Sequence, residues 1–248
     1  MTDFVVVIPA RYASTRLPGK ALRQIHGKPM LQHVFERGTE SGASEVVVAT
    51  DDERIADVAA GFGATVCMTG NQHRSGTERI AEVADLLDWD DAQVVVNLQG
   101  DEPAMPAALL DQCAELLADA TADIATLASP LLSQEDFTNP NVVKVIRDSN
   151  NHAIYFSRAA IPYVRDREAS SMAVESALHH HGIYAYRCGI LRRLVSCEPS
   201  PLEICEQLEQ LRALSLGMKI AVGIPSTRPG TGVDTEDDLQ RAEREMPA

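Results

Sequence analysis

One segment near the N-terminus gathers positive charge and contains no carboxylate. Between Phe4 and Phe35 the chain has five cationic side chains: Arg11, Arg16, Lys20, Arg23 and Lys28. The protein as a whole has a formal net charge of -14, so this excess of cations is local. Arginine binds phosphate through a bidentate fork and lysine acts as a point charge, so the segment predicts a polyphosphate-binding loop. The alternative is a group of solvated surface cations, which the lack of an acidic residue in the segment disfavours.

This basic loop fits neither of the two common phosphate-binding motifs. Ser14 stands where the G-x-x-x-x-G-K-[ST] motif requires a glycine, and no G-x-G-x-x-G opens the first expected helix. The loop instead follows an apolar strand, residues 4–8, and a loop at the carboxyl end of an early parallel strand is a usual ligand site in open α/β sheets. An ordinary ATPase or NAD-dependent enzyme is therefore disfavoured.

Two aspartates stand in turns that could face the basic loop. Asp101 follows an apolar segment, residues 94–98, and Asp234 lies in the glycine-rich segment 229–235. If both turns open onto the same cleft, two carboxylates meet a polyphosphate, an arrangement that binds Mg²⁺. As an equal alternative, Asp101 is only a turn residue and Asp234 is only an acidic residue at a helix N-terminus.

A run of three histidines and a few isolated polar residues are further candidates. Successive residues of a strand face opposite ways, so residues 179–181 are predicted to place one histidine, His180, inward and the other two outward. An inward His180 could donate to a substrate oxygen, whereas a three-histidine metal site is disfavoured. Arg158, Glu209 and Gln210 lie among apolar residues and are either ligands or parts of salt bridges and solvated faces.

Alternating strand and helix signals are expected to position these residues in an α/β fold with a largely parallel sheet. Strands are predicted at 4–8, 45–50, 65–68, 94–98, 123–128, 182–187 and 220–224. Helices are predicted at 29–42, 52–60, after a capping box at 75–78, at 107–117 and 202–214, and after a second capping box at 235–238. Residues 142–146 and 152–156 predict a hairpin. The chain is expected to form a single domain, 1–248, with an inserted antiparallel lobe at about 140–190.

Composition restricts the classes of partner. Acidic residues outnumber basic ones 36 to 22 and aromatic residues are only 4%, which disfavours nucleic acid and anionic membranes as partners. The sequence has no recognisable leader and no apolar stretch of membrane-spanning length, which predicts a cytoplasmic protein. The five cysteines are scattered and never in C-x-x-C spacing, so redox and zinc chemistry are not indicated.

Seven motifs in order along the chain resemble one enzyme family, the 3-deoxy-manno-octulosonate cytidylyltransferases (CMP-Kdo synthetases). The similarity rests on residues 8–20, 73–79, 97–103, 155–162, 180–184, 208–212 and 230–235. The resemblance implies a sugar-nucleotidyltransferase fold with a mainly parallel, Rossmann-like sheet and helices on both faces. It also implies a homodimer that uses CTP, Kdo and Mg²⁺ to make CMP-Kdo and pyrophosphate for lipopolysaccharide synthesis. His179 and His181 depart from the expected arginine and apolar residue, which leaves the local charge beside His180 open.

The resemblance also implies a role for each matched residue. Arg16, Lys20 and Asp101 would be catalytic, and Asp101 and Asp234 would bind Mg²⁺. The nucleotide would be bound by Arg11, Lys20, Arg74, Ser75 and Gly76. The sugar acid would be bound by Gln99, Arg158, His180, Tyr184, Glu209 and Gln210. The anomeric hydroxyl would attack the α-phosphate in line, with positioning and charge neutralisation supplying most of the rate.

Three alternatives remain at this point. A cytidylyltransferase for 8-amino-Kdo or sialic acid would share the fold and the mechanism. A glycosyltransferase is disfavoured because Gly100-Asp101-Glu102 lacks a D-x-D metal pattern. A non-catalytic nucleotide-binding module on the same fold would bind CTP without releasing pyrophosphate.

Overall fold

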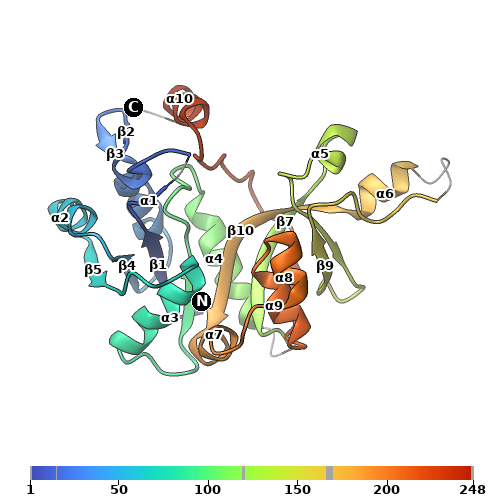
Figure 1. Ribbon diagram of the computed structural model, residues 1–248, viewed down its shortest axis with the longest axis horizontal. Helices are drawn as coiled ribbons and strands as arrows, with labels where there is room; N and C mark the ends of the chain where they lie inside the picture. The colour runs from blue at the N-terminus through green and yellow to red at the C-terminus, as the bar shows by residue number, and fades with distance from the viewer. Residues whose placement is uncertain (1, 15, 119–120, 166–169, 247–248) are drawn as a thin grey trace.

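A computed structural model describes residues 2–14, 16–118, 121–165 and 170–246 (Figure 1). Its strands are β1 Phe4–Ala10, β2 Gln24–Ile25, β3 Lys28–Pro29, β4 Glu45–Thr50, β5 Thr65–Met68, β6 Val94–Asn97, β7 Ile124–Pro130, β8 Lys144–Arg147, β9 Ala153–Ser157, β10 Leu178–Arg187 and β11 Ile220–Gly223. Its α-helices are α1 Met30–Thr39, α2 Glu53–Gly61, α3 Gly76–Leu86, α4 Ala107–Glu115, α5 Gln134–Thr138, α6 Ser170–Ser176, α7 Cys188–Val195, α8 Pro201–Glu206, α9 Gln210–Ser215 and α10 Glu236–Glu245. Two short 3₁₀ helices are η1 Lys20–Leu22 and η2 Leu116–Ala118.

The main sheet has the strand order β11-β7-β10-β6-β1-β4-β5. Strand β1 pairs in parallel with both β4 and β6, and β4 pairs in parallel with β5. In this sheet the chain runs from β1 to β4 and β5 on one side and then returns to β6 on the other side of β1, which makes the gap between β1 and β6 a topological switch point. Only β10 runs against its neighbours in this order, because it pairs antiparallel with β6 and β7. The carboxyl ends of β1, β4 and β6 thus meet at one edge of the sheet.

Helices cover both faces of this sheet and form two apolar cores. On one face, α3, α7 and α9 contribute residues such as Ile80, Leu191 and Leu211. On the other face, α1, α2 and α4 contribute residues such as Leu31, Ile55 and Leu109. Strand β1 is buried on both sides, which is why its sequence is a continuous apolar run rather than an alternating one.

A third, smaller core holds the basic loop against the C-terminal helix. Leu17 of the loop packs with Ile25 of β2 and Met30 of α1, and against these lie Val233 and Leu239. Leu239 belongs to α10, which lies near the β2–β3 hairpin in Figure 1. The last helix therefore buttresses the loop that carries Arg16 and Lys20.

The long helix predicted for residues 202–214 is wrong, because the chain breaks there into α8 and α9. Gln207 adopts a left-handed conformation with φ of 53° and ends α8. Helical spacing of the leucines continues across this break, so periodicity alone could not reveal it. The break places Glu209 and Gln210 at the start of α9 instead of in the middle of a helix.

The strand predicted at 182–187 is longer than expected. Strand β10 begins at Leu178 and takes in all three histidines, with a bulge between His181 and Tyr184. It lies in the centre of the main sheet, although it falls inside the range predicted as an inserted lobe. The β8–β9 hairpin joins the same sheet through β8, which pairs with β10, while α5 and α6 extend beyond the sheet (Figure 1). Across the described ranges, every helix is too short or too polar to traverse a lipid bilayer.

Candidate active site

A cavity of about 580 Å³ opens at the switch point between β1 and β6. Its walls come from the basic loop after β1, from the N-terminus of α3, from the turn after β6 and from the glycine-rich segment before α10. Among the described residues that line it, the charged side chains are Arg11, Arg16, Lys20, Arg74, Arg79, Asp101 and Asp234. Five cations against two carboxylates make this a site for an anion in a chain that is acidic overall.

Tertiary structure supplies the basic loop with acidic partners that its own sequence lacks. The ammonium group of Lys20 lies 2.5 Å from Oδ2 of Asp101 and 3.0 Å from Oδ1 of Asp234. Burial alone lowers the pKa of Lys20, but the two aspartates outweigh this and raise it above its usual value. The basic loop therefore has acidic partners, contrary to what its own sequence indicated, although the cavity keeps its excess of cations.

The remaining cations of the segment differ in whether they can reach a ligand in the cavity. Arg16 is 65% exposed and pairs with Asp234 at 2.9 Å. Arg23 and Lys28, by contrast, pair outside the cavity with Glu236 and Glu36. Only Arg11, Arg16 and Lys20 of the five therefore line the cavity.

Asp101 and Asp234 come together at the cavity, which is the first of the two alternatives that the sequence left open. Their carboxylates share one cation, the Lys20 ammonium group, so their oxygens are spaced to hold a single positive charge between them. Such a pair of oxygen ligands suits Mg²⁺, which commonly binds one or two carboxylates together with substrate phosphates. Within the described ranges, no group of three or more His, Cys, Asp or Glu forms a complete metal site. The two carboxylates therefore suit a metal ion whose remaining ligands come from a bound nucleotide.

Glu102 is a third carboxyl group beside this pair. Burial, together with the charges of Asp101 and Asp234, raises the pKa of Glu102 to about 8. At neutral pH the group therefore keeps its proton and adds no further negative charge to the cluster. Its side chain packs against the backbone of Gly232, where a methyl group would lie 2.7 Å from Oε1.

The N-terminus of α3 forms the wall of the cavity opposite the basic loop. Ser75 caps the helix by accepting a hydrogen bond from the backbone N–H of Glu78. The predicted capping box is only half formed, because the Glu78 carboxylate accepts from the backbone N–H of Arg74 instead. Ser75, Gly76 and Arg74 all line the cavity, and helix N-terminal N–H groups favour a negatively charged ligand.

A second, smaller cavity of about 90 Å³ lies next to the first. It is lined by Thr77, Asn97, Gln99, Ile124, Tyr184, Tyr186, Leu194, Glu209 and Gln210. Gln99 lines both cavities and so marks where they meet. Four of the six residues expected to bind a sugar acid, Gln99, Tyr184, Glu209 and Gln210, are therefore brought together here.

Glu209 ties the two cavities to each other. Its carboxylate accepts a hydrogen bond of 2.8 Å from Ser75 Oγ in the first cavity and one of 2.8 Å from Thr77 Oγ1 in the second. Burial raises the pKa of Glu209, and the two hydroxyl groups oppose this shift. A ligand in the smaller cavity thus meets a carboxylate that is already bonded to Ser75 in the wall of the larger cavity.

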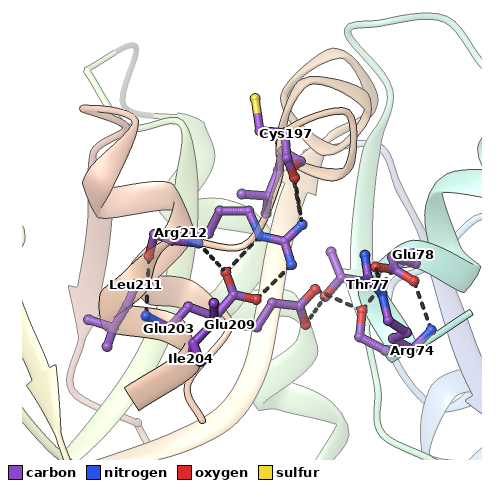
Figure 2. A network of polar contacts seen from close by, with 12 residues as sticks. Arg74, Thr77, Glu78, Cys197, Glu203, Ile204, Glu209, Leu211 and Arg212 are labelled. Carbon is purple, nitrogen blue, oxygen red and sulfur yellow. Dashed lines mark hydrogen bonds and ion pairs between the residues drawn. The ribbon is translucent and has the colours of Figure 1, made fainter. Parts of the chain in front are cut away.

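A buried ion pair holds Glu209 in place. Arg212 of α9 is 3% exposed and contacts both oxygens of Glu203 on α8, at 2.8 and 2.6 Å. Its guanidinium also donates to the carbonyl oxygen of Cys197, as Figure 2 shows. A guanidinium with this many bonds fixes the turn between α8 and α9, and through it the start of α9 where Glu209 lies.

His180 points inward as predicted but lines neither cavity. Its Nε2 lies 3.1 Å from Thr126 Oγ1, and its ring packs between those of Phe156 and Tyr184. Burial, with the neighbouring histidines, lowers the pKa of His180 to about 3. It contacts the smaller cavity only through Tyr184. His179 and His181 are half-buried and not an exposed pair as predicted, with ring centroids 4.9 Å apart.

Arg158 also lies outside both cavities, and its donors are used by the backbone. Its Nε donates to the carbonyl oxygen of Glu206 at 2.8 Å, and Nη1 donates to that of Pro140 at 3.2 Å. The carbonyl of Arg158 in turn accepts from the fully buried ammonium group of Lys144. In this arrangement Arg158 is a structural bridge between the hairpin and α8, and binding an acid would require it to exchange partners.

Several residues of the two cavities were not predicted from the sequence. Arg79 is only 5% exposed and pairs with Asp51 at 2.9 Å, and His73 bonds Glu82. Both lie in the motif that carries Ser75, so the motif was a signal for them. Asn97 is likewise the first residue of the motif that carries Gln99 and Asp101. Thr77 lies in the same motif as Ser75, whereas no sequence signal distinguished the wall residue Tyr186.

Comparisons with known proteins identify the family of this chain. A sequence model of the cytidylyltransferase family matches residues 5–220. A CMP:2-keto-3-deoxy-manno-octonic acid synthetase solved in complex with CTP is 40% identical, with 98% of each chain covered and a TM-score of 0.89.

Two more distant structures share the fold. A cytidylyltransferase from Leptospira borgpetersenii serovar Hardjo-bovis strain JB197 is 18% identical over 98% of this chain and 85% of its own, with a TM-score of 0.62. A 4-diphosphocytidyl-2C-methyl-D-erythritol synthase is 17% identical over 98% of both chains, with a TM-score of 0.64. The predicted fold class is confirmed.

Proposed function

The chain belongs to the cytidylyltransferase family, and we propose that it transfers CMP from CTP to the anomeric hydroxyl of Kdo, giving CMP-Kdo and pyrophosphate. The observation that carries this proposal is the pair of adjoining cavities. One is cationic and sized for a nucleotide, the other is small and lined by hydrogen-bonding side chains, and Gln99 lies at their junction. The similar synthetase was solved with CTP, which supports CTP as the donor.

The cationic cavity accounts for the binding of the triphosphate. Arg11, Arg16 and Lys20 face it from the basic loop, and the N-terminus of α3 faces it from the opposite side. Oxygen of the anomeric hydroxyl attacks the α-phosphorus, the bond from that phosphorus to the bridging oxygen breaks, and pyrophosphate leaves. The hydroxyl proton passes to solvent. Catalysis of this step needs alignment and neutralisation of phosphate charge, and the arginines and Lys20 provide both.

Magnesium is part of the proposal, with Asp101 and Asp234 as its protein ligands. The support is the position of Lys20, whose ammonium group marks a place between the two carboxylates that suits a cation. Bound there, Mg²⁺ would neutralise phosphate charge. Lys20 would then be free to donate to a phosphate oxygen.

The smaller cavity accounts for the sugar acid. Glu209 is a hydrogen-bond acceptor, Gln210 brings an amide and Tyr184 brings a hydroxyl group, a set that suits a polyhydroxylated chain. Its volume of about 90 Å³ accommodates only part of such a molecule, so the reacting end lies toward Gln99 and the nucleotide. The carboxylate of Kdo could be bound by Arg158 once that side chain leaves its carbonyl partners.

The deciding experiment is pyrophosphate release by the purified protein with CTP and Mg²⁺. Release that depends on Kdo supports the proposal, and parallel reactions with 8-amino-Kdo and sialic acid identify a related acceptor if one is used instead. Binding of CTP without release in any reaction would favour a non-catalytic nucleotide-binding module.

A homodimer and a cytoplasmic location complete the proposal, and both come from the resemblance to the synthetases. Light scattering of the purified protein, and fractionation of cells that express it, would test the two proposals separately.

A further inference from the structure

Unpaired polar atoms concentrate in the smaller cavity. In the part of the chain that the structure describes, four buried side-chain atoms have no hydrogen-bond partner. Three of them belong to lining residues of this cavity: Asn97 Oδ1, Tyr184 OH and Gln210 Nε2. The fourth, Asp51 Oδ1, forms an ion pair with Arg79. Because buried polar atoms in proteins are nearly always bonded, this grouping indicates a ligand site.

Asn97 stands out because none of the motif-based roles includes it. It is the last residue of β6 and only 2% exposed, and it lies directly opposite Tyr184 of β10 in the sheet register. The side chain therefore belongs to the deep wall of the cavity, two residues before Gln99 at the junction with the nucleotide. A strand in the middle of the sheet makes this a rigid position.

The chemistry of the unpaired atom restricts what can bind it. An amide oxygen only accepts hydrogen bonds, so its partner must carry a hydrogen, and a carboxylate cannot supply one. Glu209, which has the same acceptor character, lies in the same cavity and is already bonded to Ser75 and Thr77. Asn97 is thus an acceptor that remains free for a hydroxyl group of an incoming molecule.

We propose that Asn97 determines acceptor specificity, with Oδ1 accepting a hydrogen bond from one hydroxyl group of the sugar acid. This inference rests on the proposed function, because it names a partner for the acceptor of the same reaction. The unpaired oxygen distinguishes Asn97 from a structural asparagine. A structural asparagine would be hydrogen-bonded within the protein, whereas Oδ1 of Asn97 has no protein partner. Binding and stability should therefore respond differently to its removal.

The test compares Asn97→Leu, which keeps a similar volume and removes the acceptor, with the wild type. We expect kcat/KM for Kdo to fall about 10- to 100-fold, which corresponds to the loss of one hydrogen bond to a buried group. The Kd of CTP alone should change less than about twofold, and the urea midpoint should not fall, because an unpaired buried acceptor contributes no stability. Asn150→Leu, at an exposed turn of the β8–β9 hairpin, is the matched control and should leave kcat/KM for Kdo, the Kd of CTP and the urea midpoint unchanged.

Kdo analogues that each lack one hydroxyl group identify the partner. With the wild type, one analogue should lose as much kcat/KM as Asn97→Leu does with Kdo, and for that analogue the variant should cause no further loss. A loss of the same size for every analogue, an unchanged kcat/KM for Kdo, or a lower urea midpoint with unchanged kinetics would overturn the proposal. If Asn97→Leu does not fold, Asn97→Ala removes the same acceptor and is measured in the same way.

The outcome is distinct from a failure of the proposed function. If the wild type releases no pyrophosphate with Kdo, the proposed function itself is wrong. If the wild type is active and Asn97→Leu behaves like it, only the role of Asn97 is wrong.

Discussion

The ammonium group of Lys20 lies 2.5 Å from Oδ2 of Asp101, although 81 residues separate the two in the chain. Asp234 contacts the same ammonium group at 3.0 Å. Lys20, together with Arg16 on Asp234, therefore neutralises the two carboxylates that we propose as magnesium ligands. A metal ion and this lysine would compete for the same oxygens, so a nucleotide that attracts Lys20 to its phosphates should also promote binding of the metal.

Replacing Lys20 with methionine should therefore strengthen metal binding in the absence of nucleotide. We expect Lys20→Met to bind Mn²⁺ at least about threefold more tightly than the wild type, because two carboxylates lose their internal cation. Pyrophosphate release should fall by about 100-fold or more, because the same lysine is proposed to neutralise phosphate charge. Electron paramagnetic resonance of free Mn²⁺ measures the first effect. Lys28→Met, which removes a pair outside the cavity, is the control, and equal Mn²⁺ binding by all three proteins would contradict the competition.

Gly100 should not tolerate a side chain, because the turn after β6 passes very close to the end of β1. A methyl group at Gly100 would lie 2.9 Å from the carbonyl oxygen of Pro9, a backbone atom that cannot turn away. We expect Gly100→Ala to lower the free energy of unfolding by about 1–3 kcal/mol and to weaken CTP binding, because the two walls of the cavity must separate. Urea unfolding and calorimetric titration with CTP measure the effects.

Gly61 provides the comparison for this prediction. It is the last residue of α2, and a methyl group there meets no atom within 4 Å. Gly61→Ala should leave CTP binding unchanged and should slightly stabilise the protein. If Gly100→Ala behaved in the same way, the close contact between the turn and β1 would not constrain the site.

Arg212 should matter for both stability and the sugar acid. Arg212→Met leaves Glu203, whose side chain is only 12% exposed, without its partner, and removing one member of a buried pair typically costs about 3–5 kcal/mol. Because this pair fixes the start of α9, the KM for Kdo should rise more than the KM for CTP. Arg193→Met, at an exposed position of α7, is the control and should change neither the stability nor the KM for Kdo. A stable Arg212→Met protein with normal kinetics would show that the pair does not position Glu209.

The histidines of β10 should make the fold sensitive to acid. Burial lowers the pKa of His180 to about 3 and that of His181 to about 4, whereas histidine in the unfolded chain titrates near 6.5. The unfolded state therefore binds more protons over this range, so stability is complete above about pH 6.5 and is lost as the pH falls toward 4 and 3. The loss is at most about 1.4 kcal/mol per pH unit for each histidine.

Urea midpoints measured from pH 8 to pH 4 would test this pH dependence. A variant with both His180→Asn and His181→Asn should be less stable than the wild type at pH 8, because His180 loses its bond to Thr126 and His181 its bond to Ser129. Its midpoint should, however, fall less steeply below pH 6.5. Parallel curves for the two proteins would mean that these histidines do not cause the acid sensitivity.

Local sequence was sufficient for the parts of the fold that depend on neighbouring residues. The apolar run of β1, the strands at 45–50 and 65–68 and the capping box at Thr235 formed as predicted, because each depends on side chains within a few positions. The break at Gln207 was missed because the leucines around it continue a helical spacing. Its stabilising contact, Arg212 with Glu203, is visible only in three dimensions (Figure 2).

The sequence by itself determined the α/β class, the basic loop after β1 and the two turns that carry Asp101 and Asp234, because apolar periodicity and glycine-rich turns are local properties. Tertiary structure alone decided the partners of these groups. It placed Asp101 and Asp234 against Lys20, Glu209 against Ser75, and Asn97 in a cavity with its oxygen unpaired. The physical reason is that charge pairing and burial depend on distances between residues that the order of the chain does not specify. Those distances arise only when the sheet brings β1, β6 and β10 side by side.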